Sequence, residues 1–110
     1  MKKTQSLNLA IPIINLVGDY LKGNFDNLPP NEIYTLKLNY PLRKEFKFQI
    51  KTGKKGMHLF SLLKKIGKIY NDIYDDQEEY GVWGHFLDDL CLEGISINHV
   101  SKTISLDIGS

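Results

Sequence analysis

The segment Met57–Tyr74 constrains the fold more than any other, because its apolar residues recur at intervals of three and four. Polar residues fill the intervening positions, so the segment predicts an amphipathic helix of about five turns. Such a helix must bury its apolar stripe against a second layer of structure, and a chain of 110 residues can supply one within a single domain, residues 1–110. The stripe consists of Leu59, Leu62, Leu63, Ile66, Ile69, Tyr70, Ile73 and Tyr74.

Two segments before this helix alternate apolar and polar residues with a period of two. Ile33–Tyr40 and Glu45–Lys51 therefore predict strands with one buried and one wet face, and the short Pro41–Lys44 connection favours a β-hairpin. No aromatic residues interleave with the lysines of the wet face, so a nucleic-acid partner is not expected. These lysines are Lys37, Lys47 and Lys51.

The last third of the chain predicts a second hairpin. A short helical turn over Phe86–Leu90 precedes a strand that extends to Asn98, and a one-residue phase slip at Glu93-Gly94 is typical of a β-bulge. Thr103–Ile108 alternates again and is expected to pair with that strand. The two hairpins together predict a four-stranded antiparallel sheet with the helices on one face.

The N-terminal part predicts a further helix. Its apolar residues favour a helix over Ile13–Lys22 that stops at Gly23, with residues 1–12 as a loosely ordered arm. Polar residues and Pro12 interrupt the apolar run, which excludes a signal peptide or a membrane span and favours a cytoplasmic protein. The expected fold class is α+β: N-terminal helix, β-hairpin, long amphipathic helix and second β-hairpin.

The formal net charge of +1 conceals an uneven distribution along the chain. Residues 1–68 hold thirteen Lys and Arg against four Asp and Glu, a net charge of +9. Residues 69–110 hold one Lys against nine Asp and Glu, a net charge of −8. An asymmetry of this kind indicates a charged partner, although the two halves can also neutralise each other across the folded core.

The acidic part of the chain also holds its only tryptophan, Trp83. Acidic charge speeds the encounter with a basic partner, and Tyr and Trp anchors supply affinity. We therefore expect a small non-enzymatic binding protein, similar in size and charge to the inhibitors and immunity proteins by which bacteria and phages block basic proteins such as nuclease toxins. The expected partner-binding residues are Asp72, Asp75, Asp76, Glu78, Glu79, Tyr80, Trp83, Asp88 and Asp89.

An acid–base or metal-dependent enzyme is the alternative, centred on His85, Asp88 and Asp89. On one helical turn this spacing brings an imidazole and a carboxylate within reach of each other. His58 and His99 are expected to be exposed polar residues. One cysteine, Cys91, excludes an internal disulfide, and no motif implies a cofactor or a metal. A third alternative is a homo-oligomer in which a second copy completes the functional unit.

Overall fold

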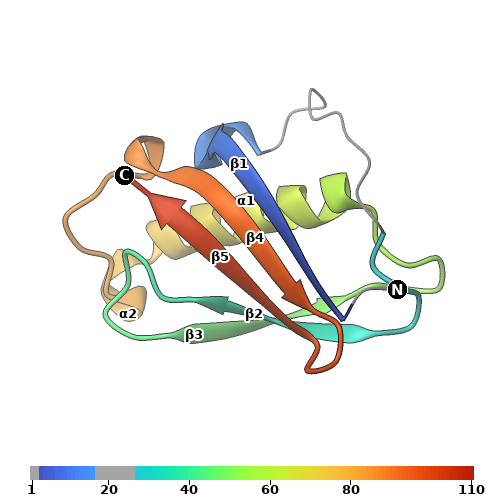
Figure 1. Ribbon diagram of the computed structural model, residues 1–110. Helices are drawn as coiled ribbons and strands as arrows, with labels where there is room; N and C mark the ends of the chain where they lie inside the picture. The colour runs from blue at the N-terminus through green and yellow to red at the C-terminus, as the bar shows by residue number, and fades with distance from the viewer. Residues whose placement is uncertain (1–2, 17–26) are drawn as a thin grey trace.

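A five-stranded mixed sheet and one long helix along one of its faces form the core of this α+β protein (Figure 1). The computed structural model describes residues 3–16 and 27–110. The α+β class and the long amphipathic helix predicted from the sequence are confirmed. The strands are β1 (Thr4–Pro12), β2 (Ile33–Leu38), β3 (Phe46–Lys51), β4 (Cys91–Asn98) and β5 (Thr103–Gly109).

The strand order is β1-β4-β5-β2-β3, so β1 and β3 are the two edges. Both predicted hairpins are present: β2 pairs antiparallel with β3, and β4 pairs antiparallel with β5. The register of the second hairpin shifts between Leu92 and Gly94, as the phase slip predicted. This arrangement places the β4–β5 hairpin in the middle of the sheet.

The expectation of a four-stranded, all-antiparallel sheet is wrong. A fifth strand, β1, pairs antiparallel with β4, and β5 lies parallel to β2 with Leu36 opposite Ile104. Parallel neighbours need a long connection, which the chain from β3 through α1 to β4 supplies. Hairpin signals report only local pairing, so the sequence pattern could not show how the two hairpins join.

The predicted N-terminal helix over Ile13–Lys22 is also wrong in the part that the structure describes. Residues 4–12, expected as an arm, form β1, and only a short 3-10 turn, η1 (Ile13–Asn15), follows. Residues 17–22 of that prediction lie outside the described residues. The period-two alternation of Leu7, Leu9 and Ile11 with exposed residues fits a half-buried edge strand.

The long helix α1 (Leu59–Asp75) packs its apolar stripe on the inner face of the sheet (Figure 1). It begins at His58, whose exposed ring accepts a hydrogen bond at Nδ1 from the Phe60 amide over 3.2 Å. Each fully buried Leu or Ile on this stripe stabilises the fold by about 1.5–3 kcal/mol relative to exposure. The buried residues of α1 are Leu62, Leu63, Ile66, Gly67, Tyr70 and Ile73.

The outer face of the sheet is polar, in keeping with the alternation in the strands. One row across all five strands contains Ser6, Ser96, Ser105, Lys37 and Lys47, which are register neighbours in that order. Lys47 is exposed there, as the sequence predicted. The sheet therefore buries apolar side chains on one face only, and its other face is in contact with solvent.

His99 lies in the turn after β4 and is buried, with 7% of its surface exposed, so the expectation of an exposed residue is wrong. Its Nε2 lies 2.8 Å from Gln5 Oε1, and its Nδ1 lies 2.7 Å from the Tyr34 hydroxyl. With the Gln5 oxygen as acceptor, Nε2 carries the hydrogen and Nδ1 of the neutral ring accepts from the tyrosine. The ring thereby links β1, the β4–β5 turn and β2.

Candidate functional site

The candidate site is built on the loop Val82–Phe86, between the short helices α2 (Gln77–Tyr80) and η2 (Leu87–Asp89). Gly81 ends α2 in the left-handed conformation, with φ of 66°. A Cβ atom at this position would lie 2.7 Å from Cγ of Arg43, so both the backbone angle and the close packing require glycine here.

Hydrogen bonds to the β2–β3 connection and to α1 fix this loop. The Trp83 amide donates to the Pro41 carbonyl over 3.0 Å, and the indole Nε1 donates to the Leu42 carbonyl over 3.4 Å. The hydroxyl of Tyr74 on α1 donates to the His85 carbonyl over 3.1 Å. The loop is thus held by α1 and by the β2–β3 connection together.

Two rings of the loop, Trp83 and His85, pack against each other and against Tyr40. The Tyr40 ring centroid lies 5.7 Å from that of Trp83 and 5.4 Å from that of His85, and the last two are 5.5 Å apart. The Tyr40 hydroxyl lies 2.8 Å from His85 Nε2 and 3.0 Å from the hydroxyl of Ser110. Through Tyr40, the cluster is therefore also hydrogen-bonded to Ser110, the last residue of the sequence.

Two large apolar side chains of this loop face the solvent. Trp83 is 48% exposed and Phe86 is 76% exposed, although Leu87, the first residue of η2, and Leu90, directly after it, pack inward. The sequence interpretation grouped Phe86 with Leu87 and Leu90 and so did not single it out. The three-residue spacing of Leu87 and Leu90 already defines the inward side of a 3-10 turn, and Phe86 lies outside it.

Exposed carboxylates precede and follow these two residues in the sequence. Asp76 and Glu79 share a hydrogen bond and repel each other, which raises the pKa of the exposed Glu79 carboxyl above its ordinary value. A cation placed beside this pair would relieve the repulsion. The predicted acids that the structure leaves exposed at the end of α1, on α2 and on η2 are Asp75, Asp76, Glu78, Glu79, Asp88 and Asp89.

Two of the predicted site residues have other contacts. Asp72 lies 3.8 Å from Lys68 in an ion pair on the surface of α1. Tyr80 is half-buried, and its ring centroid lies 4.9 Å from that of Phe46 and 6.3 Å from that of Phe48 on β3. Tyr80 thus joins α2 to the edge of the sheet, and its ring is less available to a partner than those of Trp83 and Phe86.

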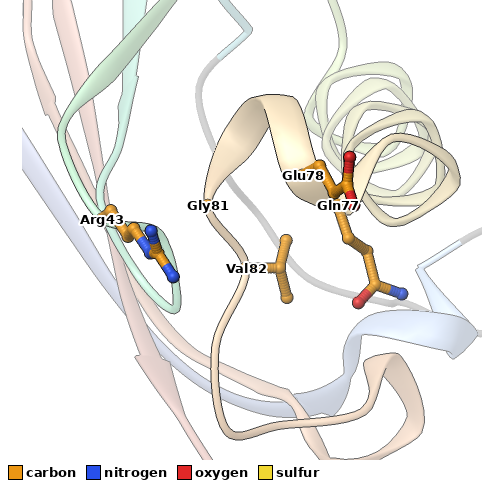
Figure 2. A pocket seen from close by; sticks show the side chains of 5 residues that line it. All are labelled: Arg43, Gln77, Glu78, Gly81 and Val82. Carbon is orange, nitrogen blue, oxygen red and sulfur yellow. The ribbon is translucent and has the colours of Figure 1, made fainter.

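A hollow of about 380 Å³ opens beside the loop. Figure 2 shows Arg43 on one side of this hollow, Gln77 and Glu78 of α2 on the other, and Val82 between them. Arg43 thus adds a positive charge to the edge of an acidic region. Nothing in the local sequence pairs the β2–β3 connection with α2, so sequence reasoning did not identify Arg43.

The alternative centre of His85, Asp88 and Asp89 is brought together only in part. His85 uses Nε2 for Tyr40, and Asp89 Oδ2 accepts a hydrogen bond from the Phe86 amide over 3.4 Å. Burial, the Asp89 charge and Tyr40 raise the pKa of Tyr74 from 10.0 to about 12. Within residues 3–16 and 27–110, no three His, Cys, Asp or Glu side chains cluster closely enough to hold a metal ion.

Comparisons with protein-family models, with curated proteins and with solved structures find no match to this chain. None of the helices in the described parts of the chain is both long and apolar enough to cross a membrane. The function must therefore be inferred from the geometry of the site itself.

Proposed function

We propose that the protein is a non-enzymatic binding protein that presents an acidic, aromatic surface to a basic protein partner. We define this surface by the exposed rings of Trp83 and Phe86 and by the exposed carboxylates that precede and follow them in the sequence. The main support for this proposal is that a hydrogen-bonded loop exposes both rings to solvent. The carboxylates are Asp75, Asp76, Glu78, Glu79, Asp88 and Asp89.

The fixed loop favours binding because little conformational freedom remains to be lost when a partner docks. Bonds to the backbone at Trp83 and His85 position the loop before any partner arrives. Preorganisation of this kind reduces the entropic cost of association. Aromatic side chains at the centre of an interface commonly contribute most of its affinity, so Trp83 and Phe86 are the expected anchors.

The carboxylates define the chemistry of the partner. Glu79 and Asp76 repel each other in the free protein, and a Lys or Arg side chain between them would remove that repulsion. Charges at the rim of an interface mainly raise the association rate and make it sensitive to salt. The proposed partner is therefore a protein with a cationic groove, such as a nuclease whose groove binds phosphates, and the protein would act as an inhibitor or immunity-type partner.

The test captures partners on immobilised protein from a lysate of the source cells. We expect a basic protein to be retained at about 50 mM salt and released at about 500 mM, because screening weakens exposed charge pairs. Phe86→Ala should reduce its retention at least about tenfold, the loss typical of an anchor residue. Val100→Ala is the matched control, because Val100 is 70% exposed and lies in the turn between β4 and β5.

A second variant separates charge from ring contact. Replacing Asp75, Asp76, Glu78 and Glu79 by their amides should slow association and flatten its salt dependence. The proposal fails if all four replacements, and Phe86→Ala, leave every retained protein bound as tightly as before.

A further inference from the structure

The edge strand β3 turns unpaired backbone groups outward. Thr35 on β2 donates its N–H to the Lys102 carbonyl, on the β5 side, over 2.8 Å. Because backbone direction alternates along a strand, Leu36 faces β3 and bonds with its partner Phe48. The alternate residues of β3 therefore point their N–H and C=O groups away from the sheet, and no described strand pairs with them. These residues are Lys47, Gln49 and Lys51.

A groove lies between this edge and α1. It has a volume of about 280 Å³ and separates the middle of β3 from the outer side of the helix. The half-buried side chains of Phe48 and Ile69 form the apolar part of its lining, and both residues pack against the core. The remaining lining residues are Gln49, Ile50, Lys65, Lys68 and Asp72.

Lysines lie on the helix side of this edge, in the lining of the groove, and also on the outer face of the sheet beside it. Lys65 and Lys68 are exposed on α1, and Lys47 is exposed on β3. Lys47 also lies directly opposite Lys37 on β2, in the register position where antiparallel side chains approach most closely. Like charges in that position destabilise a strand pair, so an anion that binds beside them would be favoured.

We propose that the β3–α1 groove binds an acidic peptide in extended conformation, which adds to the sheet as a sixth strand. Its backbone would pair with the outward groups of Lys47 and Gln49, as in other complexes formed by strand addition. Every second side chain of the peptide would face α1 and pack on Phe48 and Ile69. The acidic side chains between them would lie on the outer face of the sheet, beside Lys47. Lys65 in the groove lining adds a positive charge near the acidic peptide, whereas the charge of Asp72 is offset by its ion pair with Lys68 over 3.8 Å.

A peptide fits this groove better than a nucleic acid does. Single-stranded nucleic acids need aromatic rings on which bases stack. The residues around Lys37 and Lys47 on the outer face are hydroxyl and amide side chains: Thr35, Gln49, Ser96, Thr103 and Ser105. Only a polypeptide uses an open strand edge together with an apolar floor.

The first experiment titrates a blocked six-residue peptide of alternating valine and glutamate into the labelled protein. We expect the amide hydrogen exchange of Gln49 to slow and the amide signals of Phe48 and Ile69 to shift. The same peptide with two central residues N-methylated keeps its charge but loses the backbone donors, and we expect it to bind at least about tenfold more weakly. Equal affinity of the two peptides would overturn the proposal.

Two charge-reversal variants sharpen the test. Lys65→Glu should weaken peptide binding at least about fivefold, whereas Lys54→Glu, in the exposed turn before α1, is the matched control and should leave it unchanged. Lys47→Glu should weaken peptide binding while raising the free energy of unfolding, because it replaces the repulsion from Lys37 by attraction. A variant that lost both stability and binding would indicate a merely structural lysine and would count against the proposal.

Two further outcomes would also overturn it. A ten-nucleotide oligothymidine that bound more tightly than the peptide, with the same dependence on Lys47 and Lys65, would assign the surface to nucleic acid. Pairing of β3 between two copies of the chain, seen as a concentration-dependent dimer that Gln49→Pro abolishes, would assign it to self-association. The acidic, aromatic surface is untouched by these variants, so its own test is independent.

Discussion

In residues 3–16 and 27–110, two pairs join a tyrosine hydroxyl to a histidine nitrogen, and they serve different purposes. His99 bonds Tyr34 over 2.7 Å and Gln5 over 2.8 Å and is buried between strands. His85 bonds Tyr40 through Nε2 over 2.8 Å beside a solvent-exposed loop. The same chemical pair thus holds the sheet together in one place and positions a surface in the other.

This difference teaches that burial, and not residue type, decides what a histidine does. The sequence interpretation treated His85 as the chemically interesting residue and His99 as an exposed one. The structure gives His99 a buried partner, Tyr34, and a half-buried one, Gln5, so its loss would leave the buried Tyr34 hydroxyl without this partner in an apolar environment. Loss of His85 exposes its partners to water, which can replace the bond.

The largest expected effect distinguishes the two histidines directly. His99→Ala should lower the free energy of unfolding by about 3 kcal/mol, because it leaves the Tyr34 hydroxyl unsatisfied and opens a cavity. His85→Ala should cost about 1 kcal/mol or less. Urea denaturation of both variants measures the difference. Equal losses in the two variants would contradict the contrast.

The next effect concerns the two glycines on either side of Trp83. Gly81→Ala should destabilise the protein by about 2 kcal/mol, because the left-handed angle is strained and the new methyl group meets the Arg43 side chain. Gly84 has a similar φ of 69° but open space around it, so Gly84→Ala should cost only about 1 kcal/mol. Thermal unfolding of the matched pair gives the comparison, and a larger loss for Gly84→Ala would show that the Arg43 contact has no effect.

A smaller effect tests whether Tyr40 positions the loop. Tyr40→Phe keeps the ring packing on Trp83 but removes the bonds to His85 and Ser110, at an expected cost of about 1 kcal/mol. Binding of the basic partner should weaken because the loop loses preorganisation. Calorimetric titration gives the binding change, with Tyr34→Phe as the control that should lower stability but not partner affinity.

The smallest effect is confined to alkaline pH and comes from the ionisation of Tyr74. The folded state raises the pKa of this residue from 10.0 to about 12, so the folded protein keeps the proton after the unfolded chain has released it. The resulting stability is complete below pH 10.0 and is lost between pH 10.0 and about 12. Tyr74→Phe should make the fall in stability above pH 10.0 less steep. An unchanged slope in alkaline urea titrations would contradict this origin.

Local patterns sufficed for elements whose partners are close in sequence. The apolar stripe of α1 and the alternation in β2 and β3 predicted the long helix and the first hairpin. The phase slip at Glu93-Gly94 predicted the bulge in β4. These features depend on residues within one turn or one hairpin, so spacing alone carries the information.

Where contacts are distant in sequence, prediction failed or was silent. β1 was mistaken for a loosely ordered arm because its pairing partner, β4, begins about eighty residues later. The exposure of Phe86 depends on which side of η2 packs against the core. The Tyr40–His85 bond depends on the β2–β3 connection meeting a loop that is 45 residues away in the sequence. Sequence therefore named Trp83 and the acids as a candidate surface but could not place Phe86, Tyr40 or Arg43 beside them.

The sequence by itself determined the α+β class, the amphipathic helix and the unequal charge of the two parts of the chain. Only the tertiary structure decided that β5 runs parallel to β2, that His99 is buried and that β3 is left as an open edge facing Lys65. The physical reason is how far apart in the sequence the contacting residues lie. Helical and strand periodicity result from local backbone geometry, whereas burial and pairing depend on segments brought together by closure of long loops.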